Sequence, residues 1–421
     1  MMHCFRLLKN KKLRLQNKYR ITIFLIILSV FHHDFLFSQT SGSITQGLGV
    51  TATANLMPSC ASNHVTPVGN IKSTDNKDWI VPAETNFVGG TKLTDLHNEC
   101  NGIIPSSLAA ANLSAMPTTI IDASGDVITG YIFADNYFEL YINGVLVGVD
   151  PVPFTPFNSC AVRFKVSRPY TIAVKLVDWE ENLGLGSEIQ SATNLFHPGD
   201  GGFIAQFSDG TVTDASWKVQ TFYLAPIQDL NTVIEKPDGT RSTATASVTP
   251  TCNANCYGVH YAIPTTWNSV GFNDNPWPSA TLYTAAQVTN SISYTNFATT
   301  AWPNAKFIWS SNLILDNIVL ARKTILQNNG IKPKSDFKKL QISNPFNSVI
   351  KLKLNGEEFA FTALLCDLRG NIIQEWKECN FNFTNECILN LNAILANGVY
   401  VLQIKSEIIN YATKLMQQNQ Y

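Results

Sequence analysis

The strongest local constraint on the fold comes from the pair Asn143-Gly144. Two runs rich in β-branched and aromatic residues, Tyr137–Ile142 and Val145–Val149, flank this pair. Asn-Gly readily takes the positive φ angles of a two-residue type I′ turn, whose twist matches that of two antiparallel strands. The segment therefore predicts a β-hairpin.

Two further runs extend the predicted sheet. In residues 162–166 and again in residues 172–176, apolar side chains alternate with smaller or charged ones, among them Arg163, Lys165 and Lys175. Because successive side chains of a strand point to opposite faces, this alternation predicts one buried face and one solvated face. No stretch after residue 41 has the sustained apolar spacing of a long helix, so the sequence predicts an all-β chain with its site on loops.

The N-terminus has the pattern of an export signal. Seven cations among the first 20 residues precede the apolar run Ile21–Val30, which is typical of a signal peptide over residues 1–38. This run is about half as long as the roughly 20 residues that a spanning helix needs, although Phe31–Phe37 extends it imperfectly, so an uncleaved anchor is the alternative. Cleavage after Ser38 removes seven of 30 cations and one of 31 anions, which leaves an acidic chain. An acidic chain repels phosphate groups, which argues against nucleic acid and anionic lipid surfaces as partners.

Composition and turn signals divide the chain into segments. Its 421 residues, 45% hydrophobic and 14% charged, are enough for two or three folded domains. After the signal peptide we expect a linker or first edge strand at residues 39–58, a β-sandwich body at 59–325, a linker at 326–339 and a last β-domain at 340–421.

The last domain carries four short motifs in a fixed order: residues 342–346 (ISNPF), 366–371 (CDLRGN), 397–402 (NGVYVL) and 413–415 (TKL). With these motifs the domain resembles the C-terminal sorting domain of cargo proteins of the type IX secretion system of Bacteroidota. The resemblance implies recognition by the type IX machinery after Sec export through the periplasm. It also implies passage through the outer membrane to the cell surface or the medium, so that membrane contact is limited to transit or surface attachment. The family pattern does not need the three cysteines of this domain.

Two segments of the body carry a second, looser resemblance. Residues 137–148 (YFELYINGVLVG) and 271–280 (GFNDNPWPSA) resemble segments of the galactose-binding-like jelly-roll modules that are appended to secreted glycoside hydrolases. The resemblance implies a jelly-roll β-sandwich with a ligand on the loops at one rim and, frequently, a structural calcium ion. It assigns no individual sugar contact.

The sequence places the predicted ligand site on these rim loops, around an aromatic ring with acidic neighbours. An exposed ring can pack against the C–H groups of a sugar while neighbouring acceptors bind its hydroxyls. The alternatives are a tryptophan of the core, as most of the seven body tryptophans should be, and a Pro- and Gly-rich turn without a ligand at residues 197–202. The candidate ligand-binding residues are Asp150, Asp178, Trp179, Glu180, Glu181, His197 and Asp200.

Calcium is the one cofactor that the sequence suggests. Asp135, Asp150 and the acidic group Asp178, Glu180 and Glu181 offer the hard oxygen ligands that calcium prefers. They form no spaced ligand motif, so a solvated acidic loop is the alternative.

Eight of the nine cysteines remain after loss of the signal peptide, an even number that suits an oxidising compartment. Nearness in sequence and shared domains suggest the disulfides Cys60–Cys100, Cys252–Cys256 and Cys379–Cys387, and we expect no free thiol in the body. His97-Asn98-Glu99 with Cys252 and Cys256 is similar to a zinc deaminase signature, but the spacing between the cysteines and the β context argue against such a site.

No catalytic residue is named by the sequence. Glu139, Glu180, Glu181 and Glu188 are available carboxyls, but no two of them stand out as a glycosidase pair. The preferred hypothesis is a secreted or surface protein that binds carbohydrate. The alternatives are a structural or adhesive protein that binds protein or matrix, and a glycoside hydrolase with an unrecognised site.

Overall fold

The computed structural model describes residues 40–53, 55–56, 64–189, 196–248, 254–327, 340–354, 360–381, 385–406 and 410–418. The predicted signal peptide, Cys60, Cys252 and most of the predicted linker at 326–339 lie outside these residues. The chain forms two compact units that divide after Ile325. We call the first the body and the second the C-terminal unit.

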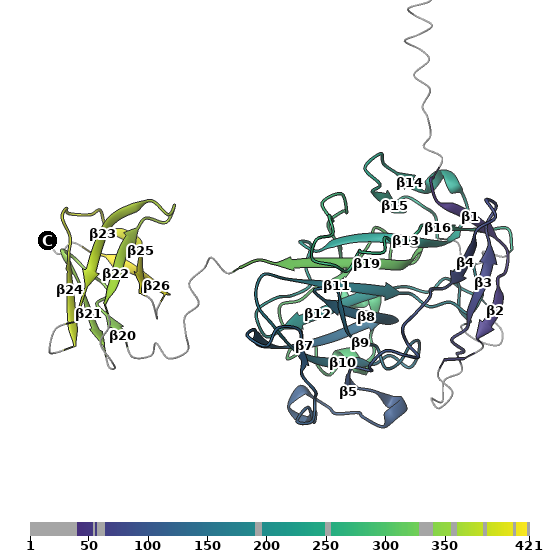
Figure 1. Ribbon diagram of the computed structural model, residues 1–421, viewed down its shortest axis with the longest axis horizontal. Helices are drawn as coiled ribbons and strands as arrows, with labels where there is room; N and C mark the ends of the chain where they lie inside the picture. Colours follow the sequence, from purple (N-terminus) through teal and green to yellow (C-terminus); the bar gives the residue numbers. More distant parts are fainter. Residues whose placement is uncertain are drawn as a thin grey trace, which may run out of the picture. The chain divides into compact units, whose positions relative to one another are not determined.

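Two sheets pack face to face in the body, as Figure 1 shows. The main sheet contains, in spatial order, β1 (Ser43–Gln46), β16 (Tyr257–His260), β13 (Lys218–Ile227), β19 (Asp316–Ile325), β11 (Tyr170–Val177), β8 (Tyr137–Ile142) and β9 (Val145–Val149). The second sheet contains β17 (Thr281–Tyr283), β18 (Phe307–Trp309), β12 (Gly202–Phe207), β7 (Asp126–Asp135), β10 (Ser159–Val166) and β5 (Thr94–His97), and β6 (Thr119–Ile120) also pairs with β10. Their facing side chains form one hydrophobic core.

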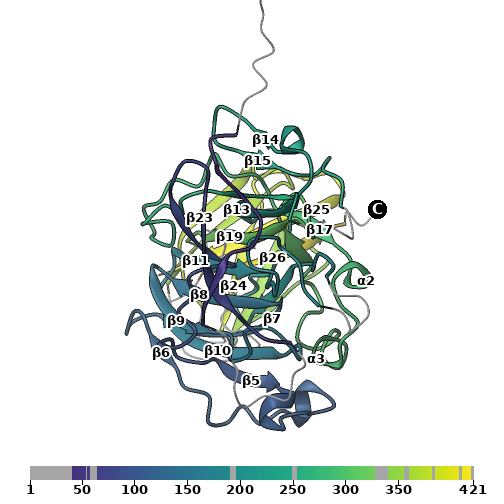
Figure 2. The same cartoon turned by 90° about the vertical axis from the view of Figure 1, so that its right-hand side faces the viewer.

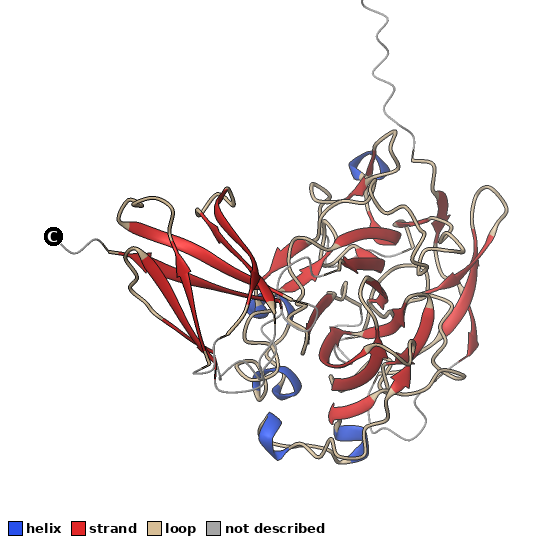
Figure 3. Ribbon diagram, turned by 60° about the vertical axis from the view of Figure 1, so that its left-hand side comes forward, coloured by secondary structure: helices blue, strands red, loops and turns tan. Residues whose placement is uncertain are grey.

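Smaller elements surround this sandwich. A sheet of β2 (Val50–Thr53), β3 (Val68–Lys72) and β4 (Asp78–Val81) and a ribbon of β14 (Ile234–Glu235) and β15 (Arg241–Ser242) are separate from it. Within the described residues, helices are limited to short segments between strands, among them α2 (Ala285–Val288) and α3 (Ile292–Thr295), as Figure 2 and Figure 3 show. The predicted all-β sandwich is confirmed.

The predicted hairpin is formed by β8 and β9. Asn143 and Gly144 take φ angles of 51° and 83°, the left-handed values that a type I′ turn requires at both central positions. The turn brings Ile142 opposite Val145 and sets the register of the edge of the main sheet.

The main sheet is covered on both faces, which differs from the sequence expectation. On its inner face, residues such as Leu140 and Val174 contact the second sheet. On its outer face, residues such as Tyr141 and Phe222 belong to a second hydrophobic cluster that includes side chains from the surrounding loops. Lys175, predicted to be solvated, is therefore only 8% exposed. The prediction of a wet face fails for β11 because chain segments distant in sequence cover it.

The N-terminal segment at residues 39–58 contains strands. Of the two alternatives for this segment, the edge strand is the one that the structure shows, because β1 pairs with β16 at one end of the main sheet. A second strand, β2, pairs with β3 in the separate three-stranded sheet.

A buried arginine fixes the loop that follows β16. Arg322 of β19 is 1% exposed. Its Nε donates to Asp274 Oδ2 at 2.8 Å, and its other guanidinium nitrogens donate to the carbonyl oxygens of Trp267 and Ser269. The guanidinium also lies over the ring of Phe272, 5.1 Å from the centroid. One side chain thus ties the whole turn between residues 267 and 274 to the main sheet.

The C-terminal unit is a small sandwich of two sheets. One contains β20 (Leu340–Ile342), β21 (Val349–Leu354) and β24 (Glu386–Asn390), and the other β23 (Ile372–Cys379), β22 (Phe361–Cys366), β25 (Gly398–Lys405) and β26 (Asn410–Gln417). Ile350, Leu365 and Leu402, each 0% exposed, lie in the core of this unit.

The predicted disulfide Cys379–Cys387 is wrong in this structure. Both residues are free thiols. They lie on β23 and β24, strands of different sheets, and meet through a hydrogen bond between their side chains instead of a covalent bond. Cys366, on β22, is a free and buried thiol as well.

In the body, Cys160 is a free and buried thiol, so the expectation of no free thiol there is also wrong. Cys100 and Cys256 are each part of a disulfide. Their predicted partners, Cys60 and Cys252, lie outside the described residues, so these two pairings stay predictions.

We expect Asp274→Ala to lower the free energy of unfolding of the body by about 3 kcal/mol, because it leaves the buried Arg322 charge without its ion pair. Urea unfolding followed by tryptophan fluorescence measures this, since seven of the eight tryptophans lie in the body. Asp78→Ala is the control, because Asp78 pairs with Lys72 in an exposed ion pair worth at most about 1 kcal/mol. Equal losses in the two variants would contradict the anchoring role of Arg322.

Candidate functional site

The predicted rim site is not an open surface. Trp179 is 1% exposed and packs edge-on against Tyr137, with the ring centroids 6.0 Å apart. Its backbone N–H donates to Asn136 Oδ1 at 2.7 Å. The core alternative therefore holds for Trp179, and the expectation of an exposed ring is wrong.

The acidic neighbours of Trp179 form hydrogen bonds within the body instead of facing solvent. Glu180 is 0% exposed and accepts hydrogen bonds from Gly184 N, Gly186 N and Tyr223 Oη. Burial raises the pKa of Glu180 to about 7, and these hydrogen bonds act in the opposite direction. The carboxylate thus organises the turn that follows it, which explains why an acidic stretch around a tryptophan did not indicate exposure.

Glu181 ties two segments together. Its carboxylate lies 2.9 Å from His64 Nδ1 and accepts hydrogen bonds from Val65 N at 3.1 Å and Ile189 N at 2.7 Å. Its side chain is 2% exposed, so it has little surface left for a ligand.

Asp150 stabilises the loop after β9. It is 1% exposed, and its Oδ1 accepts from Val152 N at 3.0 Å and from Asn158 Nδ2 at 2.7 Å. Burial raises the pKa of Asp150 to about 8, against the effect of these two hydrogen bonds. Asp150 is a structural carboxyl of the interior in this geometry.

His197 and Asp200 are half-buried and lie near other acids. His197 Nδ1 is 3.7 Å from Glu188 Oε1, and the two residues also pair through their backbones. Burial raises the pKa of Asp200 to about 7, and the charge of Glu188 adds to this shift. Burial raises the pKa of Asp135 and the pKa of Asp178, and the charges of Asp200 and Glu188 add to both shifts.

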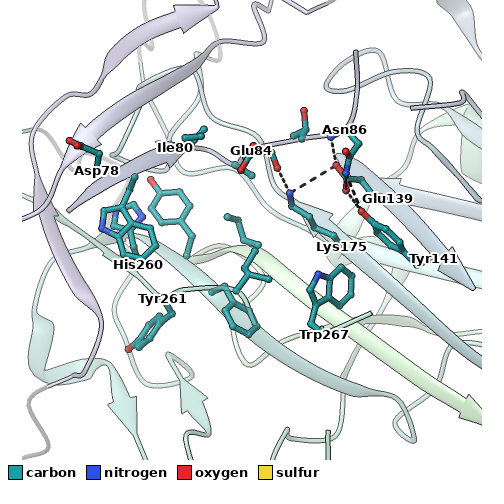
Figure 4. Close-up of a pocket in the computed structure, with 17 residues that line it drawn as sticks. Asp78, Ile80, Glu84, Asn86, Glu139, Tyr141, Lys175, His260, Tyr261 and Trp267 are labelled. Carbon is teal, nitrogen blue, oxygen red and sulfur yellow. Dashed lines mark hydrogen bonds and ion pairs between the residues drawn. The ribbon is translucent and has the colours of Figure 1, made fainter. Parts of the chain in front are cut away.

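A cleft of about 500 Å³ lies elsewhere, on the outer face of the main sheet. Its floor comes from β8, β11, β13 and β19, and its walls come from the segment that begins with β4 and from the chain after β16. Figure 4 shows labelled side chains of both walls around the opening. The residues that line it are Asp78, Trp79, Ile80, Ala83, Glu84, Thr85, Asn86, Glu139, Tyr141, Lys175, Phe222, Tyr223, His260, Tyr261, Ile263, Trp267 and Ile318.

One end of the cleft is polar. Glu139 and Lys175 are opposite each other on β8 and β11, with Lys175 Nζ 4.0 Å from Glu139 Oε1. Glu139 accepts from Asn86 N at 2.6 Å, Asn86 Nδ2 at 2.8 Å and Tyr141 Oη at 2.8 Å (Figure 4). Lys175 donates to the carbonyl oxygen of Glu84, and burial lowers the pKa of its ammonium group.

The other end of the cleft is aromatic. Trp79, which is partly exposed, stacks on His260 with centroids 5.1 Å apart, and His260 stacks on Tyr223 at 4.6 Å. Thr45 of β1 lies 2.9 Å from His260 Nε2. Burial lowers the pKa of His260 to about 3, so the imidazole is neutral at ordinary pH. Trp267 packs edge-on against Tyr141 and joins this aromatic wall to the polar end.

Sequence reasoning missed this cleft because its residues come from segments that are far apart in the chain. The available signal was the pair Glu139 and Lys175, two opposite charges within strands that otherwise predict a buried face. Their cross-strand pairing could be deduced only once β8 and β11 were known to be neighbours.

The described parts of the chain contain no arrangement of three or more His, Cys, Asp or Glu side chains that could hold a metal ion. In the same residues no helix has the length and apolar character needed to cross a membrane.

Buried acids with a raised pKa predict a pH dependence of stability. Asp150 has an ordinary pKa of 3.8 when unfolded and about 8 when folded, so between these values the folded state keeps a proton that the unfolded state has lost. Stability should therefore fall as pH rises from 4 to 8, by up to about 1.4 kcal/mol per pH unit from this group. Glu180 and Asp316, whose pKa values rise to about 7 and about 6, contribute in the same direction. In Asp150→Asn the slope, measured by urea unfolding at several pH values, should be shallower, and an unchanged slope would show that Asp150 does not titrate in this range.

Comparison with known proteins gives one assignment. The chain shows only weak similarity to solved structures. A β-glucuronidase of Faecalibacterium prausnitzii shares 10% identity at a TM-score of 0.17, covering 90% of this chain and 45% of its own. A biofilm-associated protein BSP domain shares 11% at 0.16, covering 91% and 68%. The lectin of Pleurotus ostreatus shares 12% at 0.17, covering 90% and 86%.

These values are too low to support any functional argument, and the chain spans less than half the length of that β-glucuronidase. No curated protein matches the chain.

Residues 343–418, by contrast, match the secretion system C-terminal sorting domain family. This range includes all four motifs of the last domain apart from the first residue of the first motif. The chain is therefore an exported protein whose C-terminal unit is a secretion system C-terminal sorting domain.

Proposed function

We propose that the protein is a surface or extracellular protein that binds carbohydrate in the cleft on the outer face of the main sheet. The observation that carries the proposal is the combination, in one cleft of about 500 Å³, of an aromatic end and a polar end. This volume is within the range of roughly 300–1,000 Å³ that small-molecule sites occupy.

The two ends of the cleft suit the two kinds of surface that a sugar has. The partly exposed ring of Trp79 offers a flat apolar surface to the C–H groups of a pyranose. The exposed Asn86 and Glu84, with the Lys175 ammonium behind them, offer donors and acceptors for hydroxyl groups. The pairing of Glu139 with Lys175 leaves the floor close to neutral, which favours an uncharged sugar.

The site proposed from the structure differs from the rim site proposed from the sequence. The rim residues around Trp179 are buried and hydrogen-bonded within the body. The cleft residues are held by the same kind of contacts, but an opening remains above them. The hypothesis of carbohydrate binding therefore moves from the loops to the sheet face.

Trp79→Ala should weaken glycan binding at least tenfold, about 1.4 kcal/mol, because it removes the stacking surface. Glycan-array screening identifies the ligand, and calorimetry with that glycan measures the change. Trp79→Phe should keep part of the affinity, which separates loss of the ring from loss of the fold. Trp376→Ala, a partly buried tryptophan of the C-terminal unit, is the matched control and should bind as the wild type does.

Absence of binding to any glycan, or wild-type affinity in Trp79→Ala, would refute carbohydrate recognition by the cleft. Self-association or capture of a matrix protein by the chain in that case would favour the adhesive alternative.

The sorting domain makes a separate prediction. A chain that ends after residue 339 should fold its body, because the two units have separate cores, but it should stay in the periplasm. Cell fractionation with antibody detection tests this, with the intact chain as the control for surface delivery. Delivery of the truncated chain to the surface would contradict the sorting role of residues 343–418.

A further inference from the structure

The aromatic end and the polar end of the cleft lie on different strands of the main sheet. His260 of β16 pairs with Tyr223 of β13, which pairs with Ile318 of β19. Ile318 in turn pairs with Val177 of β11, and Lys175 precedes Val177 by two residues on that strand. Neighbouring strands lie about 4.8 Å apart, and a strand rises about 3.4 Å per residue. The backbones at His260 and Lys175 are therefore about 14 Å apart across the strands and about 7 Å apart along them.

The side chains at the two ends do not close this gap. Lys175 Nζ lies 4.0 Å from Oε1 of Glu139 on β8, the strand on the side of β11 that faces away from the aromatic end. His260 stacks between Tyr223 and Trp79, with centroid distances of 4.6 and 5.1 Å, so Trp79 extends the aromatic end away from Tyr223. Figure 4 shows His260 on one side of the opening and Lys175 with Glu139 on the other.

The floor between the two ends is mainly apolar. The register of β13 against β19 shifts between Thr221 and Tyr223, and the consecutive residues Phe222 and Tyr223 both line the cleft. Such a bulge places two residues opposite one and turns a side chain to a new direction. Phe222 and Ile318 thus lie between the polar end and the aromatic end, where they offer C–H contacts to a ligand.

One segment of the chain forms a wall of the cleft from end to end. Trp79 and Asn86 both line the cleft, and the seven-residue step between them can reach about 23 Å when extended, enough to span the two ends. Trp79 Nε1 donates to Ser73 Oγ at 3.2 Å. Asn86 donates to Glu139 through its backbone N–H at 2.6 Å and through Nδ2 at 2.8 Å. The two ends of the wall are therefore fixed at separate points.

A pyranose unit of a glycan chain is about as long as one strand spacing, roughly 5 Å, so a single sugar is too short to contact both ends. The geometry points to a neutral, linear oligosaccharide of about three sugar residues that lies across the strands. One terminal sugar lies beside Trp79, the middle sugar lies on Phe222 and Ile318, and the other terminal sugar lies beside Glu84 and Asn86. This inference rests on the proposed binding of carbohydrate in the cleft, and it adds the length and the direction of the ligand.

The test measures affinity against the length of the glycan. Calorimetry of the intact exported protein uses oligosaccharides of cellulose, xylan, mannan and laminarin, each from the monosaccharide to the hexasaccharide. In a series that binds, affinity should rise about tenfold with each added sugar up to the trisaccharide and change less than about twofold beyond it.

Two variants test the two terminal positions separately. In Trp79→Ala and in Glu84→Ala, the trisaccharide should bind about as weakly as the disaccharide binds to the wild type. Glu84→Ala keeps the backbone carbonyl that Lys175 contacts, so the polar end stays assembled. Because the two ends are more than about 10 Å apart, the two losses should add in the double variant. Glu375→Ala, which removes an exposed acid of the C-terminal unit, is the matched control for Glu84→Ala and should bind as the wild type does.

Equal affinity of the wild type for the monosaccharide and the trisaccharide would overturn the inferred length, while carbohydrate binding would stand. A steady rise in affinity up to the hexasaccharide would overturn it as well, because the ligand would then extend beyond the two ends. Losses in the double variant that do not add would show that one sugar contacts both ends. Absence of binding to every glycan would refute the proposed function and, with it, this inference.

Discussion

The structure of the body depends on the burial of its main sheet on both faces. An antiparallel sheet often keeps one face in water, but here one face packs on the second sheet and the other is covered by loops. The opposite charges of Glu139 and Lys175 lie on the covered face, where each needs partners. Asn86 and the carbonyl oxygen of Glu84 supply them, so the polar end of the cleft is also what holds the covering segment to the sheet.

Local sequence signals correctly predicted the hairpin and the sorting domain, because short motifs determine both directly. The hairpin follows from Asn143-Gly144, because only a few residue pairs take two successive positive φ angles. The motifs at residues 342–415 indicated the sorting domain without any knowledge of its packing. The cover of the outer face could not be predicted, because it joins residues near position 80 to strands beginning at residues 137 and 170. The alternation of apolar and charged residues along β11 correctly predicted a strand. It does not show whether other chain segments cover the outer face of that strand.

Trp179 shows that the exposure of a candidate site residue could not be predicted from the sequence either. Acidic residues around an aromatic ring predict exposure only if water is their hydrogen-bond partner. In this loop the partners are backbone N–H groups of residues 184–189 and the hydroxyl of Tyr223, so the ring and the acids are buried together. Composition cannot distinguish the two cases, because it does not record where the donors are. The buried acids differ in how well they are paired: Asp150 accepts hydrogen bonds from Val152 N and Asn158 Nδ2, whereas Asp135 accepts one from Asn136 Nδ2 and its Oδ2 has no partner.

The position of β19 in the main sheet has a consequence for the folding of the body. This strand is the last of the body in sequence, yet it lies at the centre of the sheet, between β13 and β11. Until residues 316–325 have arrived, the sheet is divided into two halves with unpaired edges, and Arg322 cannot hold the loop at residues 267–274. A chain that lacks these ten residues therefore cannot complete the main sheet, and the body closes only when its last strand is present.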